Sequence, residues 1–318
     1  MPVHVLLAAV WLQLLPMHLE SKTDLNPSSL RFSTHDHVFF QDWSSGKTLV
    51  FAAGGELVKE AGGLGEGPGE NQLISFLHGT ADGYLVSTDG RVHFYGPDLN
   101  LIETKKTLAG YLTGIAGNKL LFNSGPHAFG YRGTLLVHDW VTKQQIRFAK
   151  ASALARGNGF AANQVSFLVP AEGEARIVWA DGLDLGDVRV YGLDGKLQGR
   201  FAPELIGLRQ GGEFKSKSYE AVQAYVNRVD IPWQFGSFGF EHEGQSYALL
   251  TYRSNGMMGE RFIVQIFALG QEDPVHVEVH EGFRHPVGFH EGQLILFEKL
   301  GWHDGRFHHR LFPVDLPL

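Results

Sequence analysis

The chain of 318 residues contains no cysteine. This absence excludes disulfides, thiolate metal ligands, cysteine nucleophiles and lipid attachment at an N-terminal cysteine. Charged residues are also few, at 19%, which argues against long solvated helices and disordered tails. The formal net charge is −7 and no block of Lys and Arg occurs, so the sequence offers no surface for nucleic acid or for an anionic membrane.

Two catalytic motifs and a full membrane span are missing as well. The sequence has neither a G-x-S-x-G nucleophile turn nor an H-E-x-x-H helix. The apolar run at residues 5–15 is shorter than the roughly 20 residues that cross a bilayer. Its length is that of a signal-peptide core, although no Lys or Arg precedes it. We therefore predict a periplasmic or secreted protein with a signal peptide at residues 1–22. The alternative is a buried or interfacial N-terminal segment.

What the chain does contain is a repeated hairpin pattern. Its clearest copy joins the apolar runs 84–88 and 91–95 through Asp89-Gly90, and similar patterns return after roughly forty residues. Asp-Gly between such runs predicts a type I′ turn, because both residues tolerate a positive φ. Hairpins repeated at this spacing predict an all-β fold, a six-bladed β-propeller of four-stranded antiparallel blades.

Six segments carry enough strand signal to be blades of one domain spanning residues 23–318. They are residues 30–61, 74–108, 111–148, 165–201, 238–279 and 287–316. An insertion at about 203–235 interrupts the repeat, and its apolar residues Val222, Tyr225, Val226 and Val229 have helical spacing. We predict a partly helical insertion there. Seven blades is the alternative, with the insertion as a degenerate blade.

A glycine-rich phrase between the first two segments points to a family. Residues 62–70 read Gly-Gly-Leu-Gly-Glu-Gly-Pro-Gly-Glu, in which glycines allow a corner and Pro68 stiffens it. This phrase resembles the inter-blade linker of NHL-type six-bladed propellers, within the TolB-like superfamily, although Asn71 stands where Phe is common there. The resemblance implies a central channel and a binding face built from loops. Phosphate binding by the phrase is the alternative, but the Lys-Ser/Thr of a P-loop is missing.

One strand offers candidate metal ligands. His276, Glu278 and His280 alternate with valines, so their side chains share one face and could hold zinc or another divalent metal. A solvated polar face is the other interpretation. Six-bladed lactonases hold a divalent metal in the channel with Glu, Asn and Asp. The comparable acids and amides near strand ends here are Asn123, Asn163, Asp181 and Asp184.

Aromatic, basic and histidine side chains at strand ends and turns are the candidate ligand-binding residues. They are His127, Tyr131, Arg132, Trp233, Arg253, His285, Trp302 and His303. Loops of a rigid scaffold carry recognition, and Trp, Tyr and Arg are frequent binding anchors. The same rings could instead pack between blades.

These patterns favour a non-enzymatic binding or scaffold protein that recognises a peptide, a glycan or a partner protein on one face of the disc. No cofactor is indicated beyond a divalent metal at the histidines. One alternative is a metal-dependent hydrolase, lactonase or lyase that uses the central channel. Another is a structural module without a small-molecule site.

Overall fold

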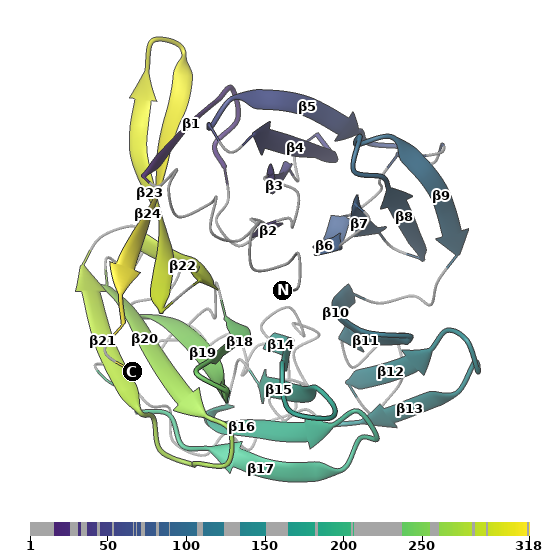
Figure 1. Ribbon diagram of the computed structural model, residues 1–318, viewed down its shortest axis with the longest axis vertical. Helices are drawn as coiled ribbons and strands as arrows, with labels where there is room; N and C mark the ends of the chain where they lie inside the picture. Colours follow the sequence, from purple (N-terminus) through teal and green to yellow (C-terminus); the bar gives the residue numbers. More distant parts are fainter. Residues whose placement is uncertain are drawn as a thin grey trace, which may run out of the picture. The chain divides into compact units, whose positions relative to one another are not determined.

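A computed structural model describes most of the chain. The described residues are 16–25, 31–32, 37–42, 45–52, 54–65, 67, 69–70, 74–80, 83–88, 90–106, 111–123, 134–150, 165–181, 184–204, 206, 237–254, 261–281, 284–290, 292–316 and 318. They form strands and turns only, and they include no apolar helix of membrane-spanning length. The strands make six four-stranded antiparallel sheets, which confirms the predicted six-bladed, all-β propeller (Figure 1).

The chain divides into two compact units, and the first holds three blades. Its sheets have the orders β2-β3-β4-β5, β6-β7-β8-β9 and β1-β24-β23-β22. Their bounds are β1 Met17–Ser21, β2 Arg31–Phe32, β3 His37–Asp42, β4 Lys47–Ala52, β5 Leu57–Gly62, β6 Ile74–Thr80, β7 Gly83–Thr88, β8 Arg91–Tyr95, β9 Leu101–Lys106, β22 Arg284–His290, β23 Gln293–His303 and β24 Arg306–Asp315.

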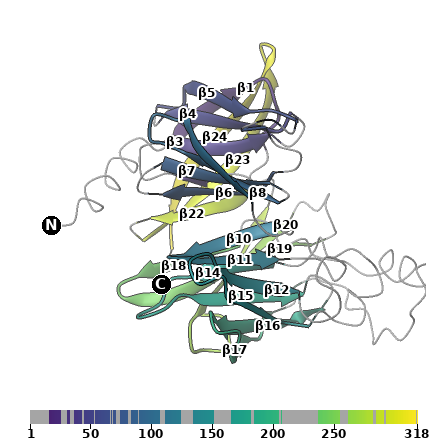
Figure 2. The ribbon, with the colours of Figure 1, turned by 90° about the vertical axis from the view of Figure 1, so that its right-hand side faces the viewer.

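The second unit holds the other three blades, in the orders β10-β11-β12-β13, β14-β15-β16-β17 and β18-β19-β20-β21. Their bounds are β10 Tyr111–Ala116, β11 Lys119–Asn123, β12 Leu135–Asp139, β13 Gln145–Phe148, β14 Val165–Val169, β15 Arg176–Asp181, β16 Asp184–Gly192, β17 Leu197–Phe201, β18 Phe238–His242, β19 Gln245–Ser254, β20 Arg261–Ala268 and β21 His276–Glu281. Figure 2 shows the same strands after a turn of 90° about the vertical axis of Figure 1.

Burial within a blade falls sharply toward its last strand. All six residues of β7 are buried, whereas all six of β9 in the same sheet are exposed. Middle strands are covered on both faces by neighbouring blades, so they read as continuous apolar runs. Apolar clusters accordingly join strands of successive blades, as Phe39 and Tyr84 do with ring centroids 4.6 Å apart.

The hairpin turns follow the sequence signals. The turn between β23 and β24 places Asp304 at φ 49° and Gly305 at φ 79°, as a type I′ turn requires. Thr88 pairs with Arg91 across the predicted Asp-Gly turn, and Gly90 has φ 72°. Local turn chemistry therefore sets the register of these hairpins.

The N-terminal boundary differs from the prediction. Residues 1–22 were expected to lie outside the fold, but Met17–Ser21 form β1, which pairs antiparallel with β24 and supplies the fourth strand of the last sheet. Buried Met17, Leu19 and Ser21 alternate with exposed His18 and Glu20 along the strand. The predicted helix in the insertion, at residues 222–229, lies outside the described residues.

Candidate functional site

Only part of the predicted ligand-binding set can be placed. His127, Tyr131, Arg132 and Trp233 lie outside the described residues. The backbone of Arg253 lies in β19, paired with Phe262 of β20. His285 lies in β22 opposite Phe297 and is only 3% exposed, so its ring belongs to the blade interior. Trp302 and His303 lie together on an exposed surface.

That surface is the tip of the β23–β24 hairpin, which we define as residues 299–308 and call the hairpin tip. Strand β22 pairs with β23 only as far as Arg284 opposite Glu298, whereas β23 and β24 continue to His303 opposite Arg306. The tip therefore extends beyond β22, as the yellow hairpin in Figure 1 shows. Strand β1 runs beside its β24 arm and pairs as far as Phe307.

Apolar side chains are exposed at the hairpin tip. Trp302 is 53% exposed and Leu300 is 40% exposed. The ring of Trp302 packs in a T-shaped arrangement with that of Phe307, its cross-strand partner, with centroids 4.6 Å apart. A β-bulge between Lys299 and Gly301 interrupts the ladder beside them. Bulges locally twist a strand and redirect side chains, so this one shapes the end of the hairpin.

Polar contacts fix the hairpin tip to the rest of the blade. Arg306 donates from Nη1 to Glu20 Oε2 of β1 at 3.2 Å, and Lys299 Nζ lies 2.7 Å from Asp24 Oδ2. At the base of the tip, Glu298 accepts hydrogen bonds from Arg284 and Arg310. Burial alone would raise the pKa of Glu298, but the two arginines outweigh burial and hold that pKa below its ordinary value.

A buried histidine lies under this network. The ring of His309 is stacked on Phe297 with centroids 5.2 Å apart, and its Nε2 lies 3.3 Å from Asp24 Oδ1. Burial lowers the pKa of His309 from its ordinary value, and the hydrogen bond with Asp24 opposes this shift only in part. The neutral ring therefore belongs to the core beneath the hairpin.

The three candidate metal ligands come together on the outer strand β21. Glu278 Oε2 lies 3.4 Å from His276 Nε2 and 3.5 Å from His280 Nε2. A carboxylate between two imidazoles is a polar contact that needs no metal. No group of three His, Asp or Glu side chains suited to hold a metal occurs in the described part of the chain. A metal at this strand, and metal-dependent catalysis, stay predictions from the sequence.

The glycine-rich phrase connects β5 to β6, as a linker between blades should. The side chain of Glu70, the last residue of the phrase, turns back toward its glycines. Its Oε2 accepts a hydrogen bond from the Gly67 amide, with a nitrogen–oxygen distance of 2.8 Å. A Cβ on Gly65 would approach the same oxygen to 2.1 Å. The buried ring of His93 connects the linker to the second blade. Its Nε2 lies 3.2 Å from the carbonyl oxygen of Glu70 in the linker, and its Nδ1 lies 2.8 Å from Thr104 Oγ1 in the blade.

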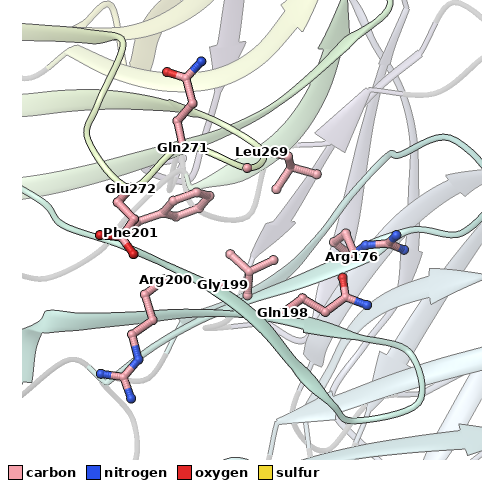
Figure 3. A pocket seen from close by; sticks show the side chains of 10 residues that line it. Arg176, Gln198, Gly199, Arg200, Phe201, Leu269, Gln271 and Glu272 are labelled. Atoms are coloured by element: carbon pink, nitrogen blue, oxygen red, sulfur yellow. The ribbon is translucent and has the colours of Figure 1, made fainter.

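A cavity of about 430 Å³, which the sequence did not reveal, lies in the second unit (Figure 3). It lies between β17 of one blade and the β20–β21 turn of the next. Its apolar lining comes from Val190, Phe201 and Leu269, and polar groups of Arg176 and Gln198 lie at one end. No sequence motif marks it, because its walls come from segments about seventy residues apart.

Comparisons with known proteins bear on the fold. No family model and no curated protein matches the chain. A structure from Bacteroides fragilis NCTC 9343, of a protein provisionally described as exported, is similar with a TM-score of 0.63 and 11% identity over 95% of each chain. A DUF4221 family member from Bacteroides vulgatus ATCC 8482 has a TM-score of 0.55 and 10% identity, over 94% of this chain and 97% of that one. The chain is thus a six-bladed β-propeller that shares its fold with these two bacterial proteins.

Proposed function

We propose that the protein is an exported, NHL-type binding propeller that recognises a protein, a peptide or a glycan through the hairpin tip. The observation that carries this proposal is the exposure of Trp302 at the end of a hairpin that extends beyond β22. The apolar run at residues 5–15 and the provisional description of the Bacteroides fragilis protein support export.

The chemistry of the hairpin tip suits recognition of a macromolecule or an oligosaccharide. Trp is among the residues that most often dominate binding energy, and its indole N–H adds a donor to a large apolar ring. Exposed His303 and Arg306 lie next to it and provide polar contacts around this anchor. Pairing with β1 and the contact with Glu20 hold the tip in place, so little order must be gained on binding.

The test is to select ligands against the intact protein and then to remove the indole. A displayed library of random dodecapeptides and a panel of immobilised oligosaccharides are the two probes. For the tightest ligand of either class, we expect Trp302→Ala to weaken binding by roughly 30-fold or more, the range of an interface hot spot. Affinities are measured by biolayer interferometry.

Ile102→Ala is the matched control. Ile102 is 69% exposed on β9 of the same unit, so its loss removes exposed apolar surface away from the hairpin. Unchanged binding in this variant and weakened binding in Trp302→Ala support the proposal. Ligands from both probes that bind Trp302→Ala as tightly as the unmodified protein would contradict it.

A further inference from the structure

The cavity in the second unit has a charged side chain at each end and an apolar middle. Phe201 is 2% exposed and stacks on Phe267 with ring centroids 4.6 Å apart, so this part of the lining is fixed by the core. At one end Arg176 donates from Nη1 to the Glu174 carbonyl oxygen, which orients its guanidinium. Figure 3 shows the amide of Gln198 beside that guanidinium.

The two walls are joined directly. The amide of Ala202, just after β17, donates to the carbonyl oxygen of Glu272 at 2.8 Å. The carboxylate of Glu272 lies on the side of Phe201 opposite Arg176 (Figure 3). The cavity is therefore held between two blades by a backbone hydrogen bond, with a cation at one end and an anion at the other.

A β-bulge leaves the cavity open. Val190 pairs with Gly199 and Tyr191 with Leu197, so Gln198 is the extra residue of β17. A Cβ built on Gly199 would meet no atom within 4 Å, which means that the space over this residue is empty. Bulges are frequent next to functional sites, where they redirect a side chain. Here the bulge places Gln198 at the end of the cavity where Arg176 lies.

We propose that this cavity binds a small monocarboxylate with an apolar body. The carboxylate meets the guanidinium of Arg176 and the amide of Gln198, and the apolar body lies across Phe201 and Leu269. A planar guanidinium matches a carboxylate through paired hydrogen bonds. Glu272 at the far end repels a second negative charge, so the site prefers one anionic group. The volume is that of a small-molecule site, and this second site is independent of the hairpin tip.

The test compares acids with their neutral amides. 3-Phenylpropionate and hexanoate are titrated into the full chain, with 3-phenylpropanamide and hexanamide as uncharged partners, and binding is followed by calorimetry and ligand-observed NMR. We expect dissociation constants of about 0.1–1 mM for the acids, in the range open to ligands of this size. The amides should bind at least ten-fold more weakly. Equal affinity of each acid and its amide would overturn the proposal.

Two pairs of variants locate the binding. Arg176→Gln should weaken acid binding at least ten-fold, whereas Arg147→Gln should change it little, because Arg147 is an exposed residue of β13 that is not part of the cavity lining. Gly199→Phe should abolish binding by filling the empty space, and Gly199→Ala should preserve most of it. Acid binding that survives both Arg176→Gln and Gly199→Phe would refute the site. If Gly199→Phe fails to fold, the arginine pair alone decides.

Discussion

His309 couples the stability of the first unit to pH. Its ring is 1% exposed, and burial lowers its pKa below the ordinary 6.5. As pH falls, the unfolded chain takes up a proton at this residue before the folded protein does. We therefore expect the free energy of unfolding to be largest above about pH 6.5 and to fall as the solution is acidified. Urea titrations between roughly pH 8 and pH 5 measure this slope.

Replacing the His309 ring shows how much of the pH dependence of the free energy of unfolding comes from this residue. His309→Phe keeps an aromatic ring against Phe297 and removes the titrating group, so it should reduce the slope. It should not abolish the slope, because burial also lowers the pKa of His93. His18→Phe, at an exposed position of β1, is the control and should keep the full slope. A slope in His309→Phe equal to that of the unmodified protein would show that this histidine plays no part.

At the scale of the element, β1 buries only one of its two faces. Leu19 is fully buried in a cluster with Phe40 and Phe297, whereas the neighbouring His18 is exposed. The carbonyl of His18 also lies against Gly55, where a Cβ would approach it to 2.0 Å. Removal of a buried leucine costs about 2–5 kcal/mol in other cores.

We expect Leu19→Asn to lower the free energy of unfolding by about 3 kcal/mol or more, because it loses apolar burial and places an amide in the core. His18→Asn introduces the same residue on the opposite face of β1 and should change the free energy by less than about 0.5 kcal/mol. Denaturant unfolding of both variants provides the comparison. Equal effects would mean that β1 does not pack as described.

At the scale of the whole molecule, the last blade is built from both ends of the described chain. β1 lies beside β24 in the sheet, and Met17 pairs with Leu311. A permuted chain that starts at Lys22 and carries residues 16–21 after Leu318, through a linker of about six residues, can make the same pairs, since each extended residue spans about 3.3 Å. We expect this permutant to fold with a similar melting temperature and circular dichroism spectrum.

A second permutant controls for the added tail. It carries the same six residues in scrambled order, so it supplies length without the alternation of buried and exposed positions seen in Met17–Ser21. This version should melt at a clearly lower temperature, because Met17 and Leu19 no longer enter the core. Identical melting of the two permutants would contradict a sequence-specific role for β1.

The architecture was predictable because its signals are local. The turn at Asp304 and Gly305 and the apolar runs beside it give the hairpin register within a few residues, and Trp302 could be recognised as exposed because it adjoins this turn. β1 was missed because its partner is nearly 300 residues away and nothing in the short segment marks the pairing. The cavity was missed for a similar reason, since its walls come from β17 and the β20–β21 turn, which are about seventy residues apart in the sequence.

The Glu70 side chain has a consequence for the linker between the first two blades. The amide of Gly67 faces an anion that is covalently part of the same loop. A tethered group acts at an effective concentration in the millimolar range or above, so a free phosphate or carboxylate in solution must displace a competitor that never diffuses away. The Glu70 carboxylate thus keeps free anions from the Gly67 amide. The glycines of the loop serve the path of the chain between blades.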